Sequence, residues 1–165
     1  MTVGVVRVGP GFEEEWPGSS ADATEVVLNV VRAGEALTAR VDSLVRRHGL
    51  PSATAMVVLE VLRGAGEPLQ PSVVAERCFL SRPALSSVMQ TLERRGYLTR
   101  RVHGEDRRRV LVDITAEGLA TMARVLPELH RAEAEWLGPV PAEERERLLE
   151  ALGAIQARMD ATART

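Results

Sequence analysis

The residues of this sequence with the clearest chemical potential are its arginines, which are concentrated in one part of the chain. Between positions 82 and 109 there are eight arginines and three acidic residues, a local excess of +5 in a chain whose formal net charge is −2. The chain has no lysine, so each of its 21 basic residues is an arginine, whose planar guanidinium matches phosphate oxygens and guanine edges. The acidic excess lies elsewhere, in FEEEW (12–16) and AEERERLLE (142–150). This distribution indicates an anion-binding face on an otherwise acidic protein.

The densest part of this positive region is the stretch HGEDRRRVLVDIT (103–115), in which three arginines follow an acidic pair. Val110, Val112 and Ile114 alternate with their neighbours, which predicts a strand, and YLTRRV (97–102) predicts its partner. The two strands would form a hairpin across HGED. So much like charge at a hairpin tip indicates an anionic partner that offsets the repulsion.

A narrow DNA minor groove is such a partner, because its negative potential attracts an inserted arginine. We expect Arg108 to make this insertion and Asp106 to hold its guanidinium in an extended rotamer through a bidentate pair. Arg107 and Arg109 would then lie near the flanking phosphates. The alternative is that Asp106 and Arg108 form only a surface ion pair that stabilises the turn.

Two short helices are expected before this hairpin. The first follows Pro71, and its inner face is formed by Val74, Ala75 and Cys78. The second begins at Ser81 as N-cap and ends at Gly96. Leu85, Val88 and Leu92 form its inward stripe. Two short helices, a tight turn and a hairpin predict a winged helix-turn-helix whose second helix enters the major groove of DNA.

The outward residues of the second helix have the side chains that this role needs. Arg82 can reach guanine or a phosphate, and Gln90 can pair with adenine, while Ser86 and Ser87 are short donors for close approach. The first turn also offers free N–H groups to a phosphate. An ordinary solvated helix face is the alternative. The full set of predicted DNA contacts is Ser81, Arg82, Ser86, Ser87, Gln90, Arg94, Arg100, Arg101, Arg107, Arg108 and Arg109, with Asp106 as support at the wing tip.

Long helices are expected on both sides of this domain, over residues 22–48, from Thr115 toward Trp136, and over 142–160. The first and the last of these helices have narrow apolar seams, which packing against a second copy of the chain would bury; packing of these two helices on each other within one chain is the alternative. The fold class predicted is therefore mainly α, with a two-stranded β wing and long dimerisation helices. The predicted division is a loosely ordered tail (1–21), dimerisation helices (22–50 and 116–165) and a winged helix-turn-helix (51–115). The seam residues are Val27, Val30, Leu37, Val41 and Leu44 in the first helix and Leu148, Leu152, Ile155 and Met159 in the last. The apolar stripe expected for the middle helix is Leu119, Met122, Leu126 and Leu129.

The stretches DRRRVLVDITAEG (106–118) and LERRGYLTRR (92–101) resemble the MarR family of bacterial regulators, and the resemblance covers roughly 25–160. It implies a homodimer that binds a pseudo-palindromic operator in double-stranded DNA. It also implies a transcriptional repressor that a small aromatic or phenolic ligand releases. Two positions depart from the family pattern: Gln70 replaces the usual Ser or Thr cap, and Phe79 occupies the turn where a smaller residue is common.

Other classes of function find little support. Cys78, the only cysteine, excludes an internal disulfide and fits a reducing compartment, and no apolar run is long enough for a membrane span. We therefore expect a cytoplasmic protein without signal peptide, and the family resemblance implies a bacterial one that is nucleoid-associated when bound. There is no catalytic motif of an enzyme, no cofactor motif and no metal-ligand spacing among Cys78, His48, His103 and His130. Two rivals stay open: a winged-helix protein-interaction module without DNA binding, and a thiol-based redox sensor that uses Cys78.

Overall fold

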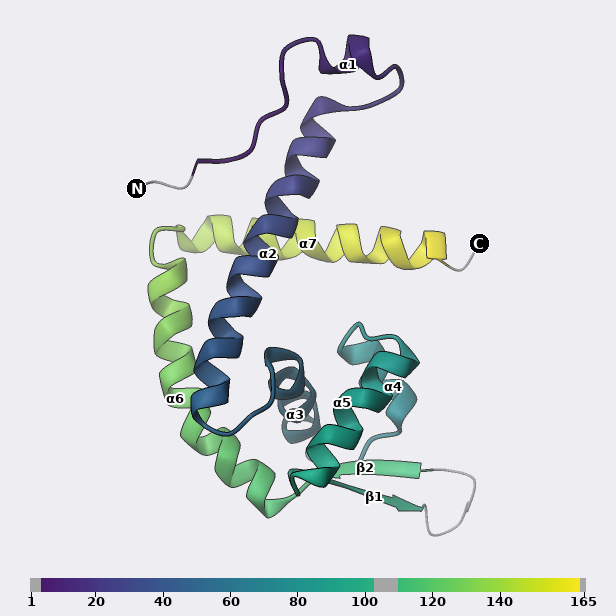
Figure 1. The fold of residues 1–165 in the computed structure, drawn as a ribbon, viewed down its shortest axis with the longest axis vertical. Coiled ribbons are helices and arrows are strands. Elements are labelled where there is room, and N and C mark those ends of the chain that lie inside the picture. The colour runs from purple at the N-terminus through teal and green to yellow at the C-terminus, as the bar shows by residue number, and fades with distance from the viewer. Residues whose placement is uncertain (1–3, 103–109, 164–165) are drawn as a thin grey trace. The chain divides into compact units, whose positions relative to one another are not determined.

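The computed structural model of the chain describes residues 4–102 and 110–163 (Figure 1). The predicted fold class is confirmed, since the described chain is mainly helical with one two-stranded antiparallel sheet. The chain folds into two units, residues 1–126 and 127–165, each packed mainly against itself. The elements are α1 (Phe12–Glu15), α2 (Ala21–Arg47), α3 (Ala53–Ala65), α4 (Pro71–Arg77), α5 (Arg82–Arg94), β1 (Leu98–Val102), β2 (Val110–Ile114), α6 (Ala116–Leu137) and α7 (Ala142–Ala163).

The core of the first unit is built around α3, which packs against α2, α4, α5 and β2. This helix is apolar on most of its circumference, as a helix covered on several sides must be. The side chains of Val58, Leu59 and Leu62 on this helix are almost completely buried in the core. Ser52 begins the helix as N-cap, because its side chain accepts a hydrogen bond from the N–H of Ala55.

Three helices of this unit end in the same tight backbone motif. In α2 the N–H of Gly49 donates to the Arg46 carbonyl, and that of Leu50 to the Val45 carbonyl, which is a Schellman motif. Gly49 has a φ of +89°, which glycine adopts without steric cost. The motif recurs after α5, where Gly96 has a φ of +73°. Both helix ends agree with the prediction from the glycines.

After α4 the residue in the corresponding position is Phe79, with a φ of +52°. Its N–H donates to the Glu76 carbonyl, and the next N–H, of Leu80, donates to the Ala75 carbonyl. A left-handed conformation costs a residue with a Cβ about 1–2 kcal/mol. The ring is 63% exposed, so burial offsets little of that cost. Gln70, the other departure from the family pattern, begins α4 without a side-chain cap hydrogen bond.

Two predicted apolar stripes need correction. In α5 the buried residues are Leu85, Met89 and Leu92, whereas Val88 is half-buried. Positions 88 and 89 are both apolar, and packing against the neighbouring elements selects the second. In α6 the expected stripe residue Leu119 is exposed, and Val125 is fully buried instead.

The sheet pairs β1 and β2 in antiparallel register, with Leu98 opposite Ile114 and Val102 opposite Val110. A short bridge joins β2 to the loop before α4. The N–H of Leu69 donates to the Val112 carbonyl at 2.9 Å, and the N–H of Val112 donates back at 2.8 Å. The hairpin is therefore attached by its second strand to the segment that leads into the helix-turn-helix.

The long helix α6 begins at its predicted N-cap, Thr115, whose hydroxyl oxygen accepts from the N–H of Gly118 at 3.0 Å. Pro127 lies inside this helix, where the sequence pattern predicted no interruption. A proline removes one backbone hydrogen bond and bends a helix. The next helix, α7, follows Pro141 as predicted and extends a little beyond the expected end at 160.

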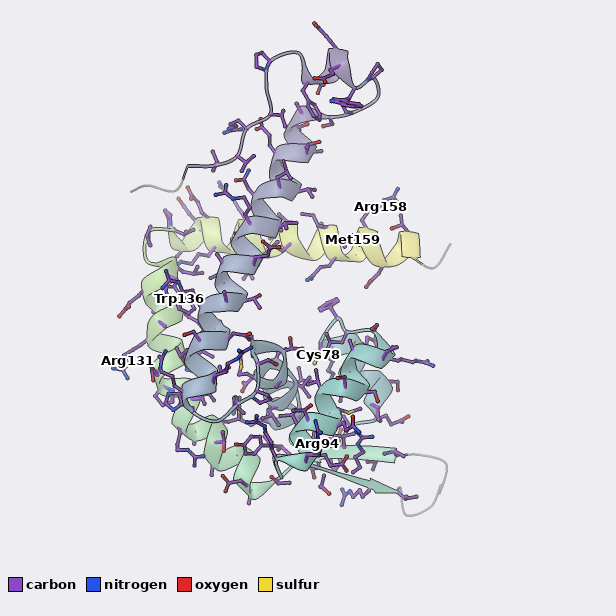
Figure 2. All side chains as sticks on the ribbon, in the orientation of Figure 1. Cys78, Arg94, Arg131, Trp136, Arg158 and Met159 are labelled. Carbon is purple, nitrogen blue, oxygen red and sulfur yellow. The ribbon has the colours of Figure 1, made fainter. Side chains whose placement is uncertain are left out.

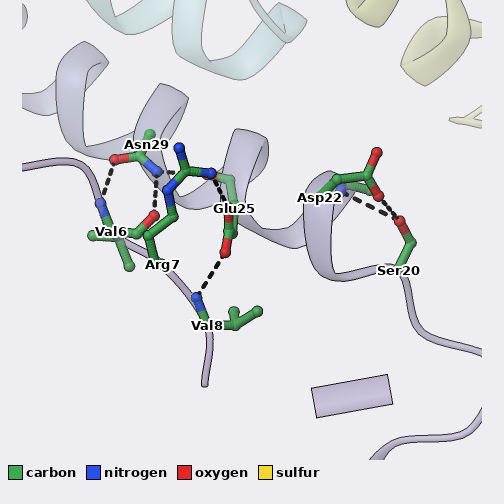
Figure 3. Close-up of polar contacts among 8 residues, drawn as sticks. Val6, Arg7, Val8, Ser20, Asp22, Glu25 and Asn29 are labelled. Atoms are coloured by element: carbon green, nitrogen blue, oxygen red, sulfur yellow. Dashed lines mark hydrogen bonds and ion pairs between the residues drawn. The ribbon is translucent and has the colours of Figure 1, made fainter. Parts of the chain in front are cut away.

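The amino-terminal segment differs from the loosely ordered tail that was expected. It contains α1, and residues 4–8 bind to α2 without forming a strand (Figure 3). Asn29 accepts from the N–H of Val6 and donates to its carbonyl, at 2.8 and 2.9 Å. Glu25 accepts from the N–H of Val8 at 3.0 Å and pairs with Arg7, and the pKa of this carboxyl lies below its usual value because of the hydrogen bond from Arg7.

Among residues 4–102 and 110–163, no helix combines the length and the apolar character that crossing a bilayer requires.

We expect Gly118→Ala to lower the free energy of unfolding. A Cβ on Gly118 would stand 2.2 Å from the Tyr97 carbonyl oxygen and 2.8 Å from Ile114 Cγ1. Overpacking of this kind costs about 1–3 kcal/mol. Urea unfolding at a fixed protein concentration measures the loss. Gly64→Ala in α3 is the control, because nothing lies within 4 Å of its added Cβ, and it should be neutral or gain up to about 1 kcal/mol. Equal midpoints for the two variants would contradict the close approach at Gly118.

Candidate nucleic-acid interface

The outward face of α5 carries the polar residues that the sequence placed there. The helix packs through its buried stripe on the core of the first unit, against α3, α4 and β1. Its opposite face is exposed and, apart from Pro83, polar, and Arg94 lies in its last turn (Figure 2). The Arg94 guanidinium donates to the Thr91 hydroxyl at 3.3 Å. The exposed residues of this face are Arg82, Ser86, Ser87, Gln90 and Arg94.

Ser81 begins α5 as predicted, since its hydroxyl oxygen accepts from the N–H of Ala84 at 3.3 Å. This bond uses an oxygen lone pair and leaves the hydroxyl hydrogen available to an acceptor. Arg82 follows directly and is exposed. Pro83 occupies the first turn, where its missing N–H removes nothing from the helix. The N-terminal end of α5 therefore presents a hydroxyl and a guanidinium together.

The wing contributes two arginines from β1, which face different surroundings. The Nε of Arg100 lies 3.1 Å from a carboxylate oxygen of Glu93, in the last turn of α5. That ion pair links the wing to the helix and partly neutralises Arg100. Arg101 is exposed and forms no ion pair within the described residues. Arg101 is thus the cation of β1 that is most available to a phosphate.

The tip of the wing lies outside the described residues. Four of the predicted site residues fall there: the arginines Arg107, Arg108 and Arg109, and their proposed support Asp106. Within residues 82–102 there are five arginines and one acidic residue, Glu93. The positive character of this face therefore does not depend on the tip.

Arg95 belongs to the same charged stretch but has a different partner. Its guanidinium donates to the carbonyl of Gly49 at 2.7 Å, at the end of α2. The hydroxyl of Tyr97 donates to the same oxygen at 3.2 Å. Nothing in the local sequence pattern indicates these two contacts. Arg95 lies 46 positions after Gly49 in the sequence, and Tyr97 lies 48 positions after it.

The other residues with reactive side chains do not form a catalytic arrangement in the described chain. Cys78 is half-buried at the end of α4, and burial raises the pKa of its thiol. His48 is the half-buried C-cap residue of α2, and His130 is exposed. Among residues 4–102 and 110–163 no three His, Cys, Asp or Glu side chains lie where they could hold a metal ion.

Two short helices joined by a tight turn, followed by a hairpin, define a winged helix-turn-helix protein. A model of the MarR family matches residues 48–109. The chain is 28% identical over 147 residues to the HTH-type transcriptional regulator PecS of Dickeya dadantii, which covers 88% of each protein.

Solved structures share the fold of this chain. The transcriptional regulator MOSR of M. tuberculosis, in complex with DNA, superposes with a TM-score of 0.67 at 23% identity, covering 84% of this chain and 98% of that one. PcaV of Streptomyces coelicolor, in complex with its natural ligand, gives 0.69 at 23%, covering 91% and 98%. Over its winged helix-turn-helix the chain is thus similar to the MarR family, and its curated relatives are transcriptional regulators.

We expect the Cys78 thiol to react slowly with alkylating agents. A raised pKa leaves less thiolate at pH 8, and the thiolate is the reactive form. Iodoacetamide labelling followed by mass spectrometry should be several-fold slower in the folded protein than in the same protein in urea. Labelling that is as fast in the folded protein would instead indicate an activated thiol and favour redox sensing.

Proposed function

We propose that this protein is a homodimeric, sequence-specific DNA-binding regulator that represses nearby genes until a small molecule releases it. The observation that carries the proposal is the exposed polar face of α5, with Arg101 exposed on the adjoining strand. A helix face that is merely solvated requires no exposed cation on a neighbouring strand. A DNA-binding surface does, because it combines a helix in the major groove with cations on the flanking phosphates. Bound across a promoter, such a dimer would block transcription by occupancy.

The contacts proposed for α5 follow from its exposed side chains. Arg82 and Gln90 are suited to read guanine and adenine edges, with Ser86 and Ser87 close to the bases. The Ser81 hydroxyl and the first-turn N–H groups are suited to a phosphate. Arg94, Arg100 and Arg101 are proposed as phosphate contacts, and the Glu93 pair makes Arg100 the weaker of the two on β1.

For the wing tip we propose the role that its residue types predict from the sequence. Arg108 is proposed to enter the minor groove with Asp106 as its support, and Arg107 and Arg109 to lie on the adjacent phosphates. The winged helix-turn-helix would then comprise residues 51–115. Residues 22–50 and 116–165 would form the dimerisation helices.

Exposed apolar residues along α2 support a homodimer. Val27, Val30 and Leu37 are 58, 39 and 43% exposed, and with Gly34 their spacing of three, four and three places them on one stripe. We call this stripe the α2 seam. The amino-terminal segment does not cover it, because that segment binds Glu25 and Asn29. Val27 stands two positions after Glu25, about 200° around a helix of 3.6 residues per turn.

In the second unit α7 shows a similar excess of exposed apolar side chains, including Leu148, Ile155 and Met159. Exposed apolar seams on long helices are a common basis for association between identical chains. In a dimer with a two-fold axis, the same seam of both subunits would be buried in the interface. A dimer would place two recognition helices about 34–36 Å apart, which matches one turn of DNA.

Release by a small aromatic or phenolic ligand is supported by the family resemblance, and PcaV is a solved relative that holds its natural ligand. Such a ligand can act only by binding more tightly to a conformation whose recognition helices are wrongly spaced. His48, half-buried at the end of α2, is a candidate lining residue.

A titration of the protein against duplex DNA from upstream of its own coding sequence tests the proposal. We expect specific binding that weakens steeply as salt rises, because phosphate contacts release counterions. A scrambled duplex is the control for specificity. Failure to bind any duplex in dilute buffer would remove the DNA-binding role and favour a winged helix that binds another protein.

Arg101→Gln should make binding less salt-dependent. Loss of one phosphate contact reduces the slope of log K against log salt by about one unit and weakens binding similarly for all sequences. Fluorescence anisotropy at several salt concentrations measures both quantities. Arg63→Gln in α3, which removes a guanidinium paired with Glu60, is the matched control and should keep the wild-type slope. An unchanged slope in Arg101→Gln would remove this residue from the phosphate contacts.

Leu37→Arg should shift the protein toward monomer. The substitution would bury an unpaired charge twice in a symmetric interface, at a cost of several kcal/mol. Sedimentation velocity over a dilution series measures the monomer fraction. Glu35→Arg also places an arginine on the exposed surface of α2, but off the seam, and should remain dimeric. Identical sedimentation of the two variants would contradict a dimer built on the α2 seam.

A further inference from the structure

Tyr97 is held by three elements of the first unit at once. Its backbone N–H donates to the Leu92 carbonyl of α5 at 3.0 Å, and its carbonyl accepts from the N–H of Thr115, the N-cap of α6, at 3.0 Å. Its side-chain hydroxyl donates to the Gly49 carbonyl, just after α2, at 3.2 Å. One residue therefore connects the end of the recognition helix with the end of α2 and the start of α6.

Arg95 strengthens the connection to α2. Its guanidinium donates to the same Gly49 carbonyl at 2.7 Å, so that one oxygen accepts from both side chains. A hydrogen bond from a charged donor is the stronger kind. Gly49 suits the site for two reasons: its φ is +89°, and a Cβ there would stand 3.2 Å from the Tyr97 hydroxyl.

The first turn of α6 closes the same junction from the other side. The Thr115 hydroxyl donates to the Gly96 carbonyl at 2.6 Å. Gly118 has no Cβ, which lets the Tyr97 carbonyl approach α6 closely. Residues 95–97 are thus fixed to the two helices that the proposed function assigns to dimerisation.

We propose that Arg95 and Tyr97 are positioning residues that set the orientation of α5 relative to α2 and the start of α6, and so select the half-site spacing of the operator. This inference rests on the proposed function. A helix of 13 residues is about 20 Å long, so a rotation of about 10° at its C-terminal end moves its N-terminal end by about 3 Å. That displacement is about the rise of one base pair, 3.4 Å.

The inference also assigns Arg95 a role unlike that of its neighbours. Arg94 and Arg101 are proposed to contact DNA, and their loss should flatten the salt dependence. Arg95 is directed at a backbone carbonyl of its own chain. Its loss should weaken the discrimination between half-site spacings while the salt slope stays at the wild-type value.

The test uses Tyr97→Phe and Arg95→Gln in the full chain, with Arg63→Gln as control. Each protein is titrated against the footprinted operator, against the same duplex with one base pair inserted or deleted between the half-sites, and against a single half-site. Thermal unfolding of each protein verifies that it is folded at the assay temperature. Tyr97→Phe removes a single oxygen atom and no charge, so it keeps the inference testable if Arg95→Gln unfolds.

We expect wild-type protein to discriminate clearly between spacings, and the two variants to discriminate about three- to tenfold less, with half-site affinity and salt slope unchanged. Because both donors share one acceptor, the double variant should lose less than the product of the single losses.

Wild-type discrimination in both variants would overturn the inference and leave the proposed function intact. So would a wild-type protein that binds all spacings equally. A flattened salt slope in Arg95→Gln would reassign Arg95 to the phosphates and overturn its positioning role. A wild-type protein that binds no duplex would overturn the proposed function itself.

Discussion

The architecture of the DNA-binding part depends on backbone hydrogen bonds that end a helix within two residues and fix the direction of the chain that follows. The motif closes α2 at Gly49, α4 at Phe79 and α5 at Gly96. Each end turns the chain within a few residues into the next element of the first unit. Short connections with fixed dihedral angles leave few ways to pack three helices and a hairpin. The polar face of α5 is consequently turned away from the core.

The interface shows how a protein with a net charge of −2 can be suited to a polyanion. Its arginines are gathered in α5 and the wing, and one of the two on β1 is paired with Glu93. An exposed pair of this kind stabilises a fold only slightly. Its effect here is to join the wing to the helix, while Arg101 stays available in the described structure. Local distribution of charge, more than its total, decides which surface attracts DNA.

Much of the fold could be predicted because its signals are local. Ser81 and Thr115 are caps followed by helical periodicity, and Gly49 and Gly96 end helices for steric reasons that a sequence reveals. The outward face of α5 could be predicted for the same reason. The burial of Met89 in place of Val88 could not be predicted, because both side chains are apolar and only tertiary packing distinguishes them. The contact of Arg95 with Gly49 has no local signal, since an arginine in a charged run indicates an external partner.

The order of the amino-terminal segment could not be predicted, for a related physical reason. Asn29 and Glu25 bind its backbone through polar side chains, and such binding leaves no periodic pattern in the bound residues. The chain enters the described structure at Gly4, whose carbonyl accepts from Arg32, one turn from Asn29 and off the apolar stripe. A small label placed on residue 4 itself would therefore lie on the polar side of α2. Labelling there leaves the apolar surface of the helix unobstructed.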